Sequence, residues 1–137
     1  MERSTEVEDL TRRIYDGMRR GDTDAVVGLI SGQDGLVWIG TDPHEWWTGY
    51  DTVVEVFQAQ LEATGGFEIV GQDPRGYREG DVGWVADQAL LRMPDGTEVP
   101  IRLTAIAHRE DGEWRFVQCH ASIGVANQEV FGEELPT

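Results

Sequence analysis

The sequence has little that would suit it to the cell exterior or to anionic partners. Cys119 is its only cysteine, which excludes an intramolecular disulfide framework and suits a reducing compartment. Only 11 Lys and Arg stand against 26 Asp and Glu, so the net charge is −15. Such a chain repels phosphate backbones and anionic lipid, and we expect it to bind neither nucleic acid nor membrane surfaces.

Targeting and membrane segments are also missing. No apolar run approaches the roughly 18 residues that a membrane span needs. The N-terminal residues 1–9 are acidic and lack the apolar centre of a secretory signal. We therefore expect a cytoplasmic protein. The length of 137 residues, with no repeat, low-complexity run or linker, predicts a single domain over residues 1–137.

Motifs for cofactors and metals are absent as well. There is no glycine-rich phosphate loop. The three histidines, His44, His108 and His120, are scattered, and no spacing of His with carboxylates recurs that would suit a metal. We expect neither a cofactor nor a metal.

The first half of the chain predicts three helices. Ser4 or Thr5 can cap the first, whose apolar residues recur at helical spacing, and Asp51 is expected to cap the third. The expected elements are helices over 5–20, 25–30 and 51–64, a strand over 36–39, and a loop over 40–50.

That loop contains the adjacent Trp46 and Trp47, in a stretch rich in Gly and Pro. Large aromatic side chains are costly to leave in water. Two interpretations remain open: both tryptophans close one end of the core, or one of them forms the wall of a ligand pocket.

From Phe67 onward the pattern predicts only strands, over 67–73, 77–78, 82–93, 98–109 and 113–123. Helices followed by an antiparallel meander are an α+β order. A strongly twisted sheet can curl around helices and bury its concave face against them. The predicted fold is therefore a cone with an open mouth.

The last two strands flank Asp111-Gly112, a strong signal for a two-residue hairpin turn. Such a turn places Arg109 opposite Trp114 and, further along, Leu103 opposite His120. Side chains alternate between the two faces of a sheet. One face would then carry Ile101, Leu103, Ala105, Ala107, Trp114, Phe116, Gln118, His120 and Ser122. The other would carry Arg102, Thr104, Ile106, His108, Arg115, Val117, Cys119 and Ala121.

Four segments resemble SnoaL-like proteins of the nuclear transport factor 2-like superfamily. They are Gly21-Asp22, Trp46-Trp47-Thr48-Gly49, Gly80–Val85, and Arg102–Thr104 followed by Asp111–Ser122. The last is also similar to the end of the calcium/calmodulin-dependent kinase II association domain. The resemblance implies three N-terminal helices in the concave face of a curved antiparallel sheet, a cystatin-like cone that encloses a ligand-sized pocket.

The resemblance leaves the function open, because superfamily members include ketosteroid isomerases, polyketide cyclases, dehydratases and assembly domains. Most form dimers through the sheet. With Trp114 on the concave face, the opposite face is the expected homodimer surface, carrying Arg102, Thr104, Val117 and Cys119.

Strand 82–93 has two candidate inner faces, Trp84-Ala86-Gln88-Leu90 or Val85-Asp87-Ala89-Leu91. The turn at Pro94-Asp95-Gly96 does not decide between them. Matching the kinase association domain places Gln88 where that family has a pocket arginine, which favours the first set. Ala105 replaces a second such arginine, so an anionic ligand is not supported.

Catalytic candidates are few. An isomerase-like triplet of Asp42, Tyr15 and Asp87 is conceivable by analogy with ketosteroid isomerases, but no motif supports it. His120 can act as a general base near neutral pH, or it can be an ordinary core or interface histidine. Alternation separates it from Cys119, which argues against a Cys–His dyad.

Our leading hypothesis is a cofactor-free, homodimeric protein that binds a small, largely apolar molecule in the cone. Its rivals are acid–base isomerase or cyclase chemistry at His120 or Asp87, and a non-catalytic assembly module. The expected lining residues are Trp38, Trp47, Phe57, Trp84, Gln88, Leu103, Phe116, Gln118 and His120.

Overall fold

A curved sheet wraps around three helices in the computed structural model of the chain, which describes residues 1–137. The helices are α1 (Thr5–Arg19), α2 (Thr23–Val27), α3 (Tyr50–Thr64) and a short α4 (Asn127–Phe131) near the C-terminus. The strands are β1 (Glu2–Arg3), β2 (Val37–Ile39), β3 (Trp46–Thr48), β4 (Glu68–Val70), β5 (Arg75–Glu79), β6 (Val82–Arg92), β7 (Glu98–Glu110) and β8 (Glu113–Ser122).

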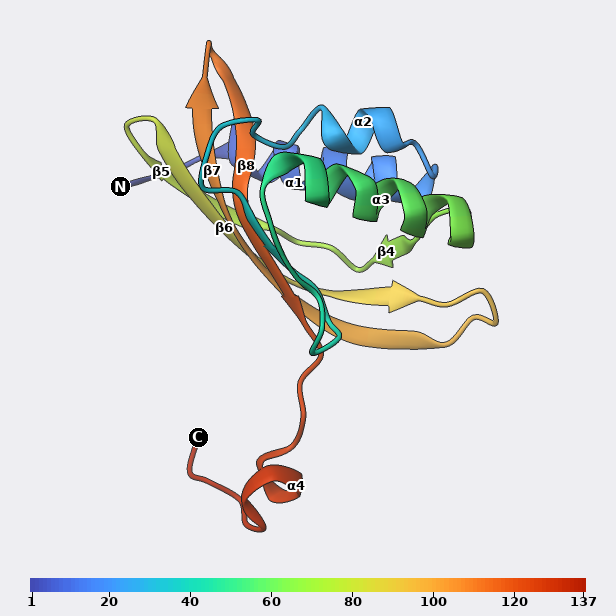
Figure 1. Cartoon of the computed structure of the whole chain (residues 1–137). Coiled ribbons are helices and arrows are strands. Elements are labelled where there is room, and N and C mark those ends of the chain that lie inside the picture. Colours follow the sequence, from blue (N-terminus) through green and yellow to red (C-terminus); the bar gives the residue numbers. More distant parts are fainter.

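The strand order is β1-β5-β6-β7-β8-β2-β3, with β4 paired to β6 outside this path. Only β2 and β8 run parallel among these strand pairs. Helices α1, α2 and α3 lie together against one side of the bent sheet, and the segment that carries α4 extends away from the body (Figure 1). The predicted α+β cone is confirmed. None of the four helices combines the length and the hydropathy that a membrane span requires.

Helix α1 begins as predicted. The Ser4 hydroxyl accepts a hydrogen bond from the Val7 N–H, and Val7, Leu10 and Ile14 are buried on its inner face. Helix α3 begins one residue earlier than predicted, because Gly49 and not Asp51 is its N-cap. Gly49 has φ of 89°, and its carbonyl accepts the first helical hydrogen bond, from Val53.

The predicted loop over 40–50 is partly wrong, since Trp46–Thr48 forms strand β3. This strand pairs with β2 and places Trp47 opposite Trp38. The Trp47 side chain is half-buried, whereas that of Trp46 points to solvent and is 65% exposed. The Gly and Pro residues of this stretch indicated a loop, although it contains a short aromatic strand at the edge of the sheet.

The β7–β8 hairpin has the predicted two-residue turn, with Arg109 opposite Trp114 and Ala107 opposite Phe116. A β-bulge follows: Ile106 pairs with Gln118, so Val117 is an extra residue in β8. Beyond it the residues of β7 lie on the predicted faces, but those of β8 lie on the faces opposite to the predicted ones. Cys119 is buried and faces Ala105, while Gln118 and His120 are exposed.

The prediction of which face of β6 points inward is also wrong. Five residues, 93–97, connect Arg92 to its partner Glu98, so odd-numbered residues of β6 pair with odd-numbered residues of β7. Val85 pairs with Ala105, and the buried side chains of β6 are Val85, Asp87 and Ala89. Trp84 and Gln88 therefore lie on the outer face.

The deep part of the cone is filled by side chains of the protein itself. A cluster of 19 buried residues from α1, α2, α3 and the sheet occupies it. Trp38 meets Phe57 and Phe116 edge-to-face, at ring-centroid distances of 5.1 and 6.4 Å. Any ligand must therefore bind nearer to the mouth.

Candidate functional site

An apolar pocket of about 200 Å³ lies at the mouth of the cone. We call it the mouth pocket. Eleven of its 15 lining residues are hydrophobic, which makes it predominantly an apolar site. It is lined by Met18, Trp38, Gly40, Thr41, Glu45, Trp47, Val53, Val56, Phe57, Gln60, Phe67, Ile69, Leu91, Ile101 and Ala121.

Helix α3 supplies one wall of the mouth pocket. Val53, Val56, Phe57 and Gln60 have the i, i+3, i+4, i+7 spacing that places side chains on one helix face. The β2–β3 hairpin supplies Trp47 to another wall. The floor belongs to the buried core, through Trp38 and Ile101.

The structure brings three of the predicted lining residues together here: Trp38, Trp47 and Phe57. Leu103 and Phe116 face inward but belong to the packed core beneath the pocket.

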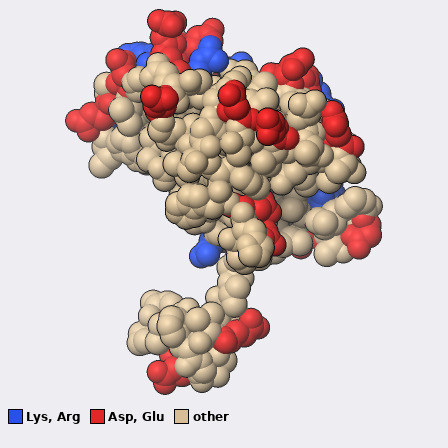
Figure 2. All heavy atoms as spheres, viewed as in Figure 1, with Lys and Arg blue, Asp and Glu red and all other residues tan.

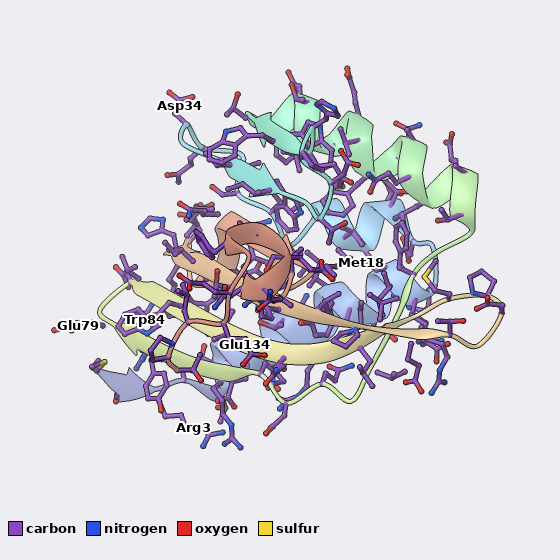
Figure 3. All side chains as sticks on the ribbon, turned by 90° about the horizontal axis from the view of Figure 1, so that it is seen from below. Arg3, Met18, Asp34, Glu79, Trp84 and Glu134 are labelled. Carbon is purple, nitrogen blue, oxygen red and sulfur yellow. The ribbon has the colours of Figure 1, made fainter.

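The remaining four predicted lining residues lie on the outer face, outside the mouth pocket. The bulge in β8 turns Gln118 and His120 outward. The five-residue connection between β6 and β7 sets the register that turns Trp84 and Gln88 outward. Figure 3 shows Met18, which lines the mouth pocket, and Trp84 in separate parts of the fold.

The polar lining residues escaped the sequence analysis. Glu45 is the only ionisable residue of the mouth pocket, and Thr41 and Gln60 add a hydroxyl and an amide. Spacing on α3 could have identified Gln60, one turn after Phe57. By the resemblance to ketosteroid isomerases, Glu45 lies with Asp42, His44 and Asp51 in the region before the third helix where a carboxylate base is expected, but it was not predicted to line the pocket.

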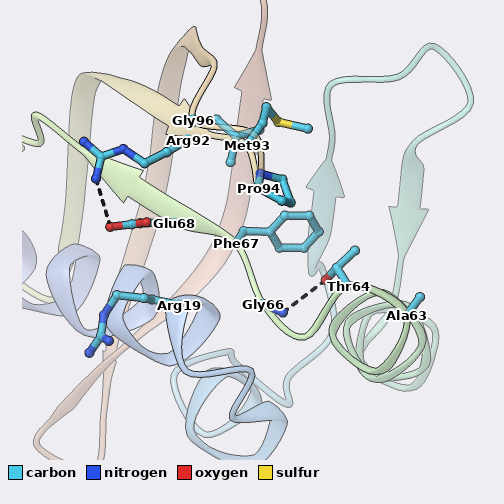
Figure 4. Close-up of a pocket in the computed structure, with 11 residues that line it drawn as sticks. Arg19, Ala63, Thr64, Gly66, Phe67, Glu68, Arg92, Met93, Pro94 and Gly96 are labelled. Atoms are coloured by element: carbon cyan, nitrogen blue, oxygen red, sulfur yellow. Dashed lines mark hydrogen bonds and ion pairs between the residues drawn. The ribbon is translucent and has the colours of Figure 1, made fainter.

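A larger depression of about 640 Å³ adjoins the mouth pocket, since Phe67 and Leu91 line both. Figure 4 shows Phe67 there beside Pro94 of the β6–β7 connection. Its two arginines are already paired: Arg19 with Asp16 at 2.7 Å and Arg92 with Glu68 at 3.4 Å. Their charges are compensated within the protein.

Asp87, one of the predicted catalytic residues, is buried together with Tyr15. The Tyr15 hydroxyl donates to Asp87 Oδ2 at 2.9 Å, and the Asp73 N–H donates to Oδ1 at 3.0 Å. Burial and then the charge of Asp87 raise the pKa of Tyr15, which keeps the phenol a neutral donor. Both carboxylate oxygens are engaged in joining α1 and a loop to β6, and neither residue lines the mouth pocket.

The remaining candidates do not assemble into a nucleophilic site. His120 and Cys119 point to opposite faces, and burial raises the pKa of the Cys119 thiol to about 12. Ser31 and His108 both contact Glu110 Oε2, at 2.7 and 3.3 Å, so the carboxylate lies between hydroxyl and imidazole. A serine nucleophile needs a direct hydrogen bond to its histidine base, so this arrangement does not form a serine–histidine pair. No cluster of three or more His, Cys, Asp or Glu is arranged to hold a metal ion.

The outer face of the sheet carries a second apolar feature, a shallow groove of about 420 Å³. We call it the outer groove. Tyr77 and Trp84 stack there at 6.5 Å, beside Ile106 and Gln118. Ile106 is 38% exposed, which is high for a residue in the middle of a long strand. Two of the four residues predicted for a dimer surface, Arg102 and Thr104, are exposed on this face, whereas Cys119 is not.

Comparison with known proteins places this fold among NTF2-like and cystatin-like structures. The model of the SnoaL-like domain family matches residues 7–126. No curated protein matches the sequence.

Three solved structures illustrate the range of similar folds. An NTF2-like protein of unknown function from Pseudomonas putida shares 17% identity and a TM-score of 0.75, covering 96% of this chain and 92% of that one. A Streptomyces avermitilis protein, provisionally described as an NTF2-like dehydratase, has 17% identity and a TM-score of 0.74, with coverage of 89% and 96%. A Thiobacillus denitrificans protein, provisionally described as a calcium/calmodulin-dependent kinase II association domain, has 21% identity and 0.73, with coverage of 86% and 94%.

Proposed function

The chain belongs to the SnoaL-like domain family, and from this premise we propose that it binds a small, largely apolar molecule in the mouth pocket. The observation that carries the proposal is the lining, which consists of eleven hydrophobic residues with a few polar groups among them. A cavity of about 150 Å³ is large enough for benzene. The mouth pocket, of about 200 Å³, suits a ligand whose apolar part is a single ring or a short branched chain.

Filling the mouth pocket should abolish binding. Ala121 lines it from β8, and Ala121→Phe is expected to weaken binding of a neutral ring compound such as 2-phenylethanol by at least about tenfold, because the larger side chain occupies the space. Calorimetric titration measures this directly. Ala59→Phe, on the exposed side of α3 and outside the pocket, is the matched control. Failure of a panel of neutral single- and double-ring compounds to bind the wild-type protein would refute the proposal.

We also propose that the protein forms a homodimer through the outer groove. The support is the exposed Ile106 beside the stacked pair Tyr77 and Trp84, an apolar strip on the open face of the sheet. The wild-type protein should sediment as a dimer. Ile106→Glu should yield monomers, because it buries a charge at the centre of the interface.

Val130→Glu is the control for dimerisation, since Val130 is 63% exposed in the C-terminal segment and does not line the groove. A monomeric wild-type protein at micromolar concentration, or an Ile106→Glu variant that still dimerises, would contradict the proposed dimer.

A further inference from the structure

Glu45 differs from the other acidic groups that the fold shields from solvent. Glu8 accepts hydrogen bonds from Arg3 and from the Gly76 N–H, and Asp87 and Glu110 are likewise engaged. The half-buried Glu45 side chain makes no hydrogen bond or ion pair within the protein, although it lines the mouth pocket. Because it has no partner within the protein, this carboxylate is free to pair with a cationic group of a ligand.

Hydrogen bonds of the β2–β3 turn fix the backbone of Glu45. The Gly40 N–H donates to the Glu45 carbonyl, and the Glu45 N–H donates to the Asp42 carbonyl, both at 2.9 Å. The carboxylate lies directly against Gly40, where a Cβ atom would overlap Glu45 Oε2. Gly40 is thus a positioning residue: its missing side chain creates the space that Glu45 occupies.

The surroundings favour positive charge. Trp38, Trp47, Phe57 and Phe67 line the same pocket, and aromatic rings attract cations through their faces. The net charge of −15 raises the local concentration of cations around the protein, and Figure 2 shows acidic side chains spread over the visible face with few basic ones between them. The arginines of the adjoining depression are paired with carboxylates, so none of them neutralises Glu45.

We propose that the ligand of the mouth pocket is a small organic cation, with its apolar body among the aromatic residues and an ammonium group held by Glu45. This inference rests on the proposed function of the same pocket and adds the charge of the ligand. It involves no covalent step.

Three probes of similar size separate the contributions: 2-phenylethylamine, which is protonated at pH 7, neutral 2-phenylethanol and anionic 3-phenylpropionate. We expect the amine to bind about tenfold or more tightly than the alcohol in calorimetric titrations at low salt, and the anion to bind most weakly. The preference for the amine should shrink as salt is raised, because screening weakens the charge pair.

Glu45→Gln should remove the preference for the amine while leaving the affinity for 2-phenylethanol nearly unchanged. Glu55→Gln, which removes the same charge from an exposed position on α3 outside the pocket, should keep the preference. Gly40→Ala should reduce the preference without changing the charge of the protein, because the added methyl group displaces the carboxylate.

The possible results are distinguishable. If the amine and the alcohol bind the wild-type protein equally, or if the anion binds most tightly, the inference is overturned while the apolar pocket stands. If none of the three probes nor any neutral ring compound binds, both the inference and the proposed function fail. If the Glu45→Gln variant still prefers the amine, a group other than Glu45 holds the ammonium, and the inference is overturned.

Discussion

Replacing Phe116 with alanine is expected to lower the free energy of unfolding by about 4 kcal/mol, because the change leaves a cavity at the centre of the core. The side chain is 1% exposed and packs edge-to-face against Trp38. Its backbone also bridges to the segment after α2, donating to the Leu29 carbonyl and accepting from the Ser31 N–H. These hydrogen bonds hold the backbone around the cavity in place. The neighbouring side chains can therefore move little into the cavity, and little of the lost stability is recovered.

Phe131→Ala is the matched control, since the same atoms are removed from a side chain that is 62% exposed. It should change the free energy of unfolding by less than about 0.5 kcal/mol. Equilibrium unfolding in urea, followed by tryptophan fluorescence, measures both variants. A Phe116→Ala variant within about 1 kcal/mol of the control would mean that the core is far more adaptable than its packing indicates.

The inward direction of Phe116 was predictable because it lies between the Asp111-Gly112 turn and the bulge. Pairing counted outward from a two-residue turn is reliable as long as each strand contributes one residue per pair. Val117 breaks that rule without a sequence signal, since bulges of this kind need no glycine. The prediction therefore held for Trp114 and Phe116 and failed for Gln118, Cys119 and His120.

The inner face of β6 was unpredictable for a related reason. Its direction depends on whether the connection to β7 has an odd or an even number of residues, and Pro94-Asp95-Gly96 is compatible with either. The mouth pocket was partly foreseen, since Trp38, Trp47 and Phe57 were expected to line it. Glu45 was not, because its distinction is the absence of a partner, which only the three-dimensional arrangement reveals.

Gly66→Ala is expected to lower the free energy of unfolding by about 3–5 kcal/mol, because it combines backbone strain with a collision between two helix ends. Gly66 has φ of 126°, a conformation that side chains disfavour. A Cβ atom there would lie 2.6 Å from the Met18 carbonyl oxygen and 2.7 Å from that of Arg19. The next residue is held in place, since the Phe67 N–H donates to the Met18 carbonyl.

Gly65→Ala separates the two causes. Gly65 also has positive φ, at 75°, but an added Cβ atom would meet nothing within 4 Å. Gly65→Ala should lower the free energy of unfolding by only about 1 kcal/mol, which is the strain of an alanine in the left-handed conformation. Equal losses for the two variants in urea unfolding would show that the contact of α1 with the end of α3 contributes nothing. A larger loss for Gly66→Ala would show that this contact sets the spacing of the helices, and with it the position of Phe67, whose side chain lines the mouth pocket.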